Sequence, residues 1–216
     1  MTITSKAVAC GLAIALSSCS VENTEYSQYF QLVRQVIDQS FSDHRVPLEA
    51  VTATPYASMG WRLNDGPEDM IVLATDDHGQ QIWTSAAKIV LQTQDGRIVR
   101  TVGLGRDILG MTAQNNTAVS PPSRALNGPY SENRITDFPE AYGVATSCTA
   151  QFMGARQVTI LDRTIRTLQV DEQCQRGDWH FTDSYWLDPN THMVWQSTQH
   201  LSAKMVIRTA ILRPPG

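Results

Sequence analysis

The sequence predicts a mainly β domain, an antiparallel-rich β-barrel or sandwich-like fold preceded by an N-terminal amphipathic helix. Short runs of β-branched, aromatic and other apolar residues recur along the chain, with Gly, Pro, Asn and Asp between them. Neither an internal repeat nor a linker-like stretch divides residues 24–216. We therefore expect these residues to form one domain, and their number is sufficient to bury a real core.

Residues 1–18 have the pattern of a lipoprotein signal peptide. Lys6 precedes an apolar run over residues 7–16, which is too short to span a bilayer, and Leu16-Ser17-Ser18-Cys19 then reads as a lipobox. We expect cleavage before Cys19, which becomes the lipid attachment site, with acyl chains such as palmitate anchoring the protein to the membrane. Ser20 rather than Asp follows the cysteine, which predicts the periplasmic face of the outer membrane.

Residues 19–23 form a short polar tether, and residues 24–40 predict one amphipathic helix. Its apolar face carries Tyr26, Tyr29, Phe30, Val33, Val36 and Ile37 at helical spacing. The simpler interpretation is that this face docks onto the sheet. The alternative is that its aromatic side chains contact a partner.

A meander of strands follows a connector over residues 46–56. The expected strands are residues 59–63, 70–74, 82–84, 88–93 and 98–102. Residues 70–74 are continuously apolar, as in a strand buried on both faces. Residues 76–79 predict a turn, and Asp95-Gly96 predicts a type I′ hairpin, because both residues tolerate positive φ.

The pattern weakens over residues 113–133, which are rich in Asn, Ser, Pro and Gly and predict a long loop with at most short strands. Strand signals resume after residues 138–140. A hairpin is expected over residues 156–161 and 164–170, around Asp162-Arg163. Further strands are expected at residues 179–187, 193–200 and 205–212, with a Pro-containing turn at residues 188–191.

The four cysteines are expected to have different roles. Cys10 leaves with the signal peptide and Cys19 takes the lipid, so Cys148 and Cys174 remain as a pair in an oxidising compartment. We predict a disulfide between them. Two free thiols are the alternative, and no C-x-x-C spacing points to a metal or redox role.

No motif predicts catalysis, a metal or a cofactor. The chain lacks a G-x-S-x-G elbow and a phosphate-binding loop. His180, His192 and His200 lie near neighbouring strands without the spacing of a zinc site. The acidic residues of the first half lie at turns, where Asp bonds its own backbone: Asp65, Glu68, Asp69, Asp76, Asp77 and Asp107. A net charge of −4 without a basic stripe argues against nucleic acid as a partner.

Aromatic side chains are the remaining candidates for contact with a glycan or a protein partner, because exposed Trp stacks on sugar rings and anchors interfaces. All five tryptophans fall on expected strands: Trp61, Trp83, Trp179, Trp186 and Trp195. For any single one, packing in the core is the simpler interpretation. Strand alternation places Trp179 and Trp186 on opposite faces, so we expect one of them to lie away from the main core.

The chain resembles the YjbF/GfcB family of lipoproteins, which is named for group 4 capsule polysaccharide operons. The resemblance is carried by the lipobox, by PYASMGWRLNDGPEDMIVLA and IWTSAAKIVLQTQDGRIVRTVGLGRDILGM, and by YWLDPNTHMVWQSTQHLSAKMVIRTAILRPP. It spans nearly the whole mature chain and is weakest over residues 113–133. The resemblance implies a β-barrel-like domain with an N-terminal helix. It also implies a role in exopolysaccharide or capsule secretion beside an outer-membrane β-barrel export protein and a periplasmic partner from the same operon. It carries over no catalytic residue.

We therefore expect a non-enzymatic outer-membrane lipoprotein that assists exopolysaccharide or capsule assembly or export, with direct contact to polysaccharide left open. The alternatives are a glycan-acting hydrolase or lyase and a carbohydrate-binding module. A cleft that gathers two carboxylates, or a carboxylate and a histidine, would favour the enzyme. Coplanar exposed aromatic residues in one groove would favour the binding module.

Overall fold

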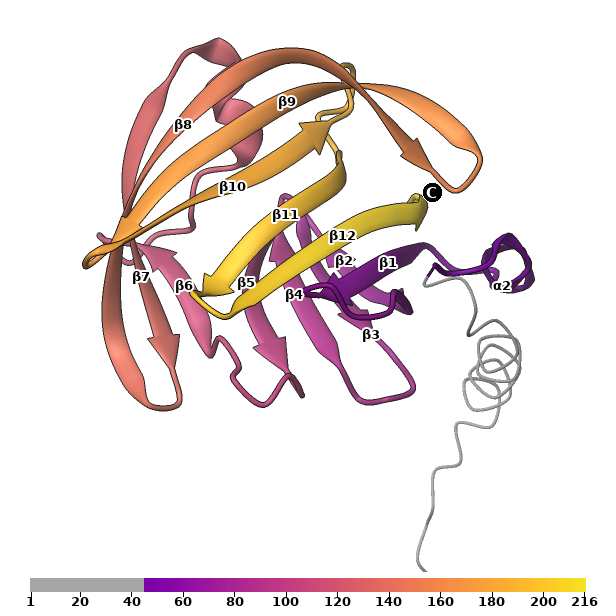
Figure 1. Cartoon of the computed structure of the whole chain (residues 1–216), viewed down its shortest axis with the longest axis horizontal. Coiled ribbons are helices and arrows are strands. Elements are labelled where there is room, and N and C mark those ends of the chain that lie inside the picture. Colours follow the sequence, from indigo (N-terminus) through magenta and orange to yellow (C-terminus); the bar gives the residue numbers. More distant parts are fainter. Residues whose placement is uncertain (1–44) are drawn as a thin grey trace, which may run out of the picture.

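A computed structural model of the protein describes residues 45–216 (Figure 1). The expected signal peptide, the tether and the helix over residues 24–40 lie outside this range. Its elements are α2 (Leu48–Ala53), β1 (Ser58–Leu63), β2 (Asp69–Asp77), β3 (Gln80–Thr84), β4 (Val90–Gln94), β5 (Arg97–Val102), β6 (Gly110–Ala113), η1 (Pro122–Asn127), β7 (Tyr130–Phe138), β8 (Ala141–Ile160), β9 (Arg163–Arg176), β10 (Trp179–Leu187), β11 (Val194–Ser202) and β12 (Met205–Arg213).

The strands form one antiparallel sheet that curls into a nearly closed barrel (Figure 1). Except for β5 and β6, strands that are consecutive in the sequence pair with each other, and β1 pairs with β12. The two ends of the sheet are therefore β5 and β6. At this seam the Thr101 N–H donates to the carbonyl of Ile108 at 2.9 Å. The Asp107 carboxylate supports the loop by accepting from the Thr101 hydroxyl and from the backbone N–H of Gly103 and Leu104. The predicted antiparallel-rich β fold is confirmed, and of the two expected forms, a barrel or a sandwich, the structure shows the barrel.

Short turns with the expected chemistry set the register of the sheet. Asp95 and Gly96 have φ of 50° and 82°, as the predicted type I′ hairpin between β4 and β5 requires. Between β10 and β11, the Asp188 carboxylate accepts from the N–H of Asn190 and Thr191. These two turns explain why the sequence located the flanking strands well.

A large apolar cluster fills part of the barrel interior. Met59 and Trp61 alternate with Gly60 on β1, so Met59 and Trp61 face inward and Gly60 faces outward. The inward cluster is Met59, Trp61, Ile71, Trp83, Leu91, Ile98, Ile108, Leu201, Met205, Ile207 and Ile211. Burying these side chains is the main source of stability in this part of the barrel.

A second apolar cluster lies on the outer face of the sheet. The far end of the β8–β9 hairpin arches across the barrel wall toward α2 (Figure 1), and there it buries Val158 and Ile160 against Met70 and Leu212. Ala50 of α2 packs into the same cluster. Among residues 45–216, no helix combines the length and hydrophobicity that a bilayer crossing needs.

The sequence missed the strands whose inward positions are polar. β7 and the first half of β8 occupy a region expected to be a loop or left unassigned, because Glu132, Arg134 and Thr136 point inward where the pattern requires apolar residues. The β8–β9 hairpin is confirmed, but both strands are much longer than predicted. Residues 76 and 77 end β2 instead of beginning the turn, and the expected connector over residues 46–56 contains α2.

Candidate functional site: a polar network inside the barrel

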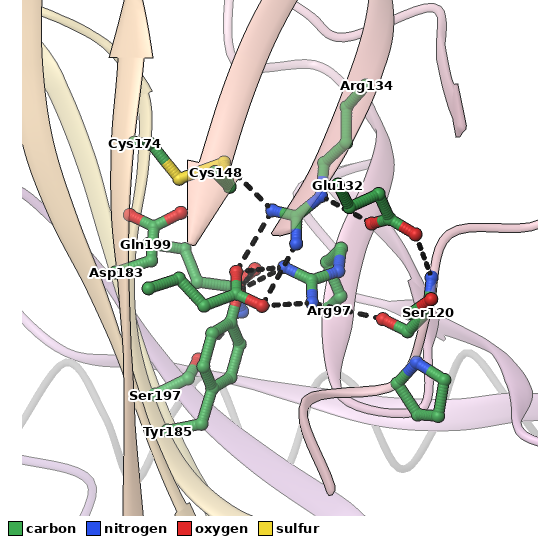
Figure 2. Close-up of polar contacts among 12 residues, drawn as sticks. Arg97, Ser120, Glu132, Arg134, Cys148, Cys174, Asp183, Tyr185, Ser197 and Gln199 are labelled. Carbon is green, nitrogen blue, oxygen red and sulfur yellow. Dashed lines mark hydrogen bonds and ion pairs between the residues drawn. A yellow bond between two sulfur atoms is a disulfide. The ribbon is translucent and has the colours of Figure 1, made fainter. Parts of the chain in front are cut away.

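A buried ionic network lies in another part of the barrel interior, beside a smaller apolar cluster that includes Val170 and Leu187 (Figure 2). Glu172 on β9 is fully buried and faces two arginines from distant strands. Arg97 of β5 donates to its two carboxylate oxygens at 2.5 and 2.7 Å, and Arg134 of β7 donates to both at 2.9 Å. Two bidentate pairs on one carboxylate fix its position and tie β5, β7 and β9 together.

Further polar groups complete the network. The Arg97 guanidinium also donates to the Tyr185 hydroxyl at 2.8 Å and to the carbonyl of Ser120 at 3.2 Å. Arg134 Nε donates to Glu132 at 2.9 Å, and Glu132 accepts from the N–H of Ser120. The network thus contains two guanidinium groups and two carboxylates, so its formal charges balance.

Electrostatics hold these groups in fixed protonation states. Burial alone would raise the pKa of Glu172, but the two arginines outweigh burial and lower it to about 2. Burial and the nearby Glu172 raise the pKa of Tyr130 to about 12, and burial raises that of Tyr185 well above its usual value. At neutral pH Glu172 is therefore ionised and both tyrosines are protonated, which suits a structural clamp better than general acid–base catalysis.

A carboxylate–histidine pair lies at the edge of this network. Asp183 of β10 is the cross-strand partner of Glu172, and its Oδ1 lies 2.8 Å from the backbone N and 3.0 Å from Nδ1 of His200. Burial raises the pKa of Asp183. Trp179 and Phe181 stack at 4.1 Å beside His200. This is the described arrangement that most resembles an acid–base pair.

One group of potential metal ligands is already engaged in other bonds. Glu172, Cys174 and Asp183 offer ligand atoms within 4.8 Å of one another. The Cys174 sulfur forms a disulfide, however, and both Glu172 oxygens face guanidinium groups. The donor set therefore does not suit a cation.

The predicted disulfide between Cys148 and Cys174 is present. The two residues are direct cross-strand partners on β8 and β9, and both are buried inside the barrel. Cys148 lies within β8 rather than before the hairpin, because β8 begins earlier than the sequence indicated. The bridge lies beside the network, since Arg134 Nη1 is 3.4 Å from the Cys148 sulfur.

The five tryptophans do not gather in one groove. Trp61 and Trp83 are buried in the inward apolar cluster, and Trp83 Nε1 donates to Thr93, so neither side chain is presented to a partner. Trp186 and Trp195 are half-buried against the outer cluster beneath the β8–β9 hairpin. Trp179 is half-buried at the start of β10. With Phe181 and the Arg176 guanidinium beside it, Trp179 is the tryptophan best placed to contact a ligand.

The barrel has a pocket of about 370 Å³ near the β4–β5 turn. Trp83, Met59 and Ile211 line its apolar side, while Thr93 and His192 belong to its polar side. Pockets in the mouths of β-barrels commonly hold small ligands. A smaller hollow of about 190 Å³ lies beside Phe138 and Arg176.

Sequence reasoning missed Arg97, Arg134 and Glu172. Arg97 stood in a recognised turn and strand, yet nothing local showed that its side chain is buried. A signal was present on β7, where three alternating polar residues precede a cysteine-bearing strand. Reading it required the partner strands, because a buried charge is plausible only when its counter-charge is known.

Comparisons with known proteins agree with the lipoprotein fold. A family model described as "Group 4 capsule polysaccharide lipoprotein gfcB, YjbF" matches residues 32–212. Relatives in Escherichia coli (strain K12) include uncharacterized lipoprotein YjbF, 27% identical over 94% of both chains. Uncharacterized lipoprotein GfcB is 27% identical over 80% of this chain and 83% of its own. The crystal structure of the hypothetical lipoprotein YmcC from E. coli shares the fold, with a TM-score of 0.67 and 24% identity over 86% of this chain and 97% of that one.

Proposed function

Because the chain belongs to the group 4 capsule polysaccharide lipoprotein family, we propose that it is a non-enzymatic accessory factor in exopolysaccharide or capsule assembly or export. The observation that carries this proposal is the family match, which covers nearly all of the domain. The domain acts by contact, as a rigid barrel held close to the membrane.

The interior chemistry supports a role without catalysis. The charged groups at the centre of the barrel bond to one another, and Glu172 is held ionised by two arginines. Such a network braces the wall of the barrel and offers no free nucleophile. The remaining surface is then available for an outer-membrane β-barrel export protein, a periplasmic partner or the polysaccharide itself.

The proposed location is the periplasmic face of the outer membrane, through lipid on Cys19. The basis is the sequence Leu16-Ser17-Ser18-Cys19-Ser20, together with the lipoprotein relatives. Fractionation of inner and outer membranes tests this location. A Cys19→Ala variant is expected to lose lipid labelling and its outer-membrane position, whereas Cys10→Ala in the discarded segment is the matched control.

The function is tested by deleting the gene and measuring surface and released polysaccharide. We expect less polysaccharide at the surface, recovery with the wild-type gene, and failure with Cys19→Ala. Crosslinking in intact cells is expected to recover an export component with the wild-type protein. Unchanged polysaccharide in the deletion strain, with no export component recovered, would refute the proposal.

A glycan-acting enzyme is the second candidate, and the Asp183–His200 pair beside Trp179 is the observation in its favour. His200→Asn discriminates between the two functions, because the change removes proton transfer while keeping a side chain of similar polarity. An accessory protein retains polysaccharide output with this variant. An enzyme loses output and leaves polysaccharide of altered chain length.

A further inference from the structure

A large pocket of the described domain lies outside the barrel. Its volume is about 650 Å³, and it opens between the tip of the β8–β9 hairpin and the outer faces of β1 and β12. Its lining is rich in charged and hydrogen-bonding side chains: Arg45, Arg62, Glu68, Thr159, Asp162, Gln196 and Arg208. A pocket of this size lies in the range of small-ligand sites.

Two arginines of this pocket lie directly opposite each other. Arg62 on β1 and Arg208 on β12 are cross-strand partners, an arrangement of like charges that destabilises an antiparallel pair. Arg208 is partly compensated, because its guanidinium donates to the carbonyl of Asn64 at 2.6 Å and to Asp65 at 3.3 Å. Within residues 45–216, the guanidinium of Arg62 forms no hydrogen bond or ion pair with another side chain or a carbonyl, and the same holds for the guanidinium of Arg45.

The acidic residues of the pocket do not neutralise Arg62. The Glu68 carboxylate lies over Gly60, where a Cβ would come within 2.8 Å of Glu68 Oε1. Its other oxygen accepts the N–H of Val46 at 3.0 Å and so holds the chain entering the domain. Glu68 thus has a structural role. No carboxylate within residues 45–216 forms an ion pair with Arg62 that would offset its repulsion from Arg208.

We propose that this pocket binds an acidic saccharide through a carboxylate or phosphate group placed between Arg62 and Arg208. An anion there removes the cross-strand repulsion and gains charge-assisted hydrogen bonds from planar guanidinium groups. Arg45 adds a third positive charge at the rim. The choice of a saccharide as the ligand rests on the proposed function. The arginines make that function more specific, because they select an acidic saccharide.

The rest of the lining suits a sugar. Thr159, Gln196 and Asp162 offer hydroxyl, amide and carboxylate groups around the arginines. Sugar hydroxyls both donate and accept hydrogen bonds, so a ring attached to the anionic group finds partners of both kinds. A phosphate from a lipid headgroup shares the anionic chemistry, and the experiment separates the two sources.

The test uses the full lipoprotein purified in neutral detergent, with isothermal titration calorimetry at low salt. The probes are oligogalacturonate, inorganic phosphate and a neutral maltooligosaccharide. We expect oligogalacturonate to bind most tightly and the neutral sugar not to bind. Arg62→Gln should weaken binding about tenfold or more, as the loss of a charged hydrogen bond predicts. Arg100→Gln, which removes an exposed arginine of β5 outside the pocket, should leave affinity unchanged.

A stability measurement separates binding from folding. Because Arg62→Gln removes a like-charge pair and breaks no described contact, its melting temperature should equal or exceed that of the wild type. The assignment would be overturned if Arg62→Gln lowered the melting temperature and if Arg62→Gln and Arg100→Gln lost affinity for oligogalacturonate equally. Absence of oligogalacturonate binding, or binding of phosphate alone, would also overturn it.

The lipid arm adds phosphatidylglycerol or phosphatidylcholine to the micelles before titration. If phosphatidylglycerol displaced the saccharide, and if Arg62→Gln abolished this effect, the pocket would be assigned to a lipid headgroup. That result would overturn the saccharide proposal. Binding of oligogalacturonate with normal polysaccharide in the deletion strain would refute the proposed function alone. Defective polysaccharide without any binding would refute this inference alone.

Discussion

Replacing Glu172 by Gln tests whether the buried network stabilises the barrel. The substitution keeps the side-chain shape but removes the negative charge that faces Arg97 and Arg134. Two guanidinium groups would then remain buried with only Glu132 as an ionised partner. Uncompensated buried charge is costly, and removal of one partner from such a network typically destabilises by about 3–5 kcal/mol.

The pKa of Glu172 gives a second route to the magnitude. Its fall from the usual 4.5 to about 2 corresponds to about 3 kcal/mol of extra stability when the group is ionised in the folded state. For a domain of this size, that loss lowers the melting temperature by roughly 6–12 °C. Both estimates therefore predict a large loss of folding stability from the single substitution Glu172→Gln.

The assay is urea unfolding of the oxidised protein from pH 2 to pH 7, with Glu140→Gln as the control because Glu140 is exposed. A folded-state pKa below the unfolded value means that the stabilisation is present above pH 4.5. It is then lost as the pH falls toward 2. The wild type should show this loss and Glu172→Gln should not, so their stabilities converge in acid.

Two results would refute the reasoning. One is a cost within about 1 kcal/mol of the Glu140→Gln control, which would mean that the network contributes little. The other is a constant difference between the wild type and Glu172→Gln across the acid range, which would mean that the charge is not responsible. A double-mutant cycle with Arg97→Gln adds a check, since residues in contact should show non-additive effects.

Three other predictions concern the covalent and local features of the barrel. Replacing Cys148 and Cys174 together by Ala should lower the free energy of unfolding in urea by about 3–4 kcal/mol, because the bridge restricts the unfolded chain. Adding a reducing agent to the wild type should lower it by the same amount, which checks the prediction. Gly96→Ala should cost roughly 1–3 kcal/mol more than Gly105→Ala, since both have positive φ but only the first places a Cβ against the side chain of Val194. Comparable melting temperatures for the two glycine variants would contradict this. Asp183→Asn should remove a fall in stability as the pH rises above 3.8, because a raised pKa makes the folded state bind more protons there than the unfolded state. Parallel curves for this variant and the wild type would show that Asp183 is not the source.

The sequence located strands best where turns and burial both followed simple rules. The Asp95-Gly96 hairpin and the strand over residues 179–187 were predicted closely, because positive φ and alternation are local properties. β7 was missed because its inward face carries Glu132, Arg134 and Thr136. Local patterning identifies an inward face only when that face is apolar, and the inward face of β7 is not.

The tryptophans show the same division between local and tertiary information. Alternation along β10 correctly separated Trp179 from Trp186, which lie on different faces. It could not show that the β8–β9 hairpin folds over the outer wall and half-buries Trp186 there. Exposure depends on segments that are distant in the sequence, so aromatic residues alone did not identify a binding surface.

The sequence by itself determined the turns and most strand positions, and it predicted the pairing of Cys148 with Cys174. These follow from backbone conformation, composition and residue counting, whereas the family was indicated by a resemblance in particular motifs. Only the tertiary structure decided that Arg97, Arg134 and Glu172 meet inside the barrel, and that Arg62 and Arg208 face each other outside it. The physical reason is that the effect of a charge depends on its partners and its solvent exposure. In a twelve-stranded sheet both are set by which strands the closing barrel brings together.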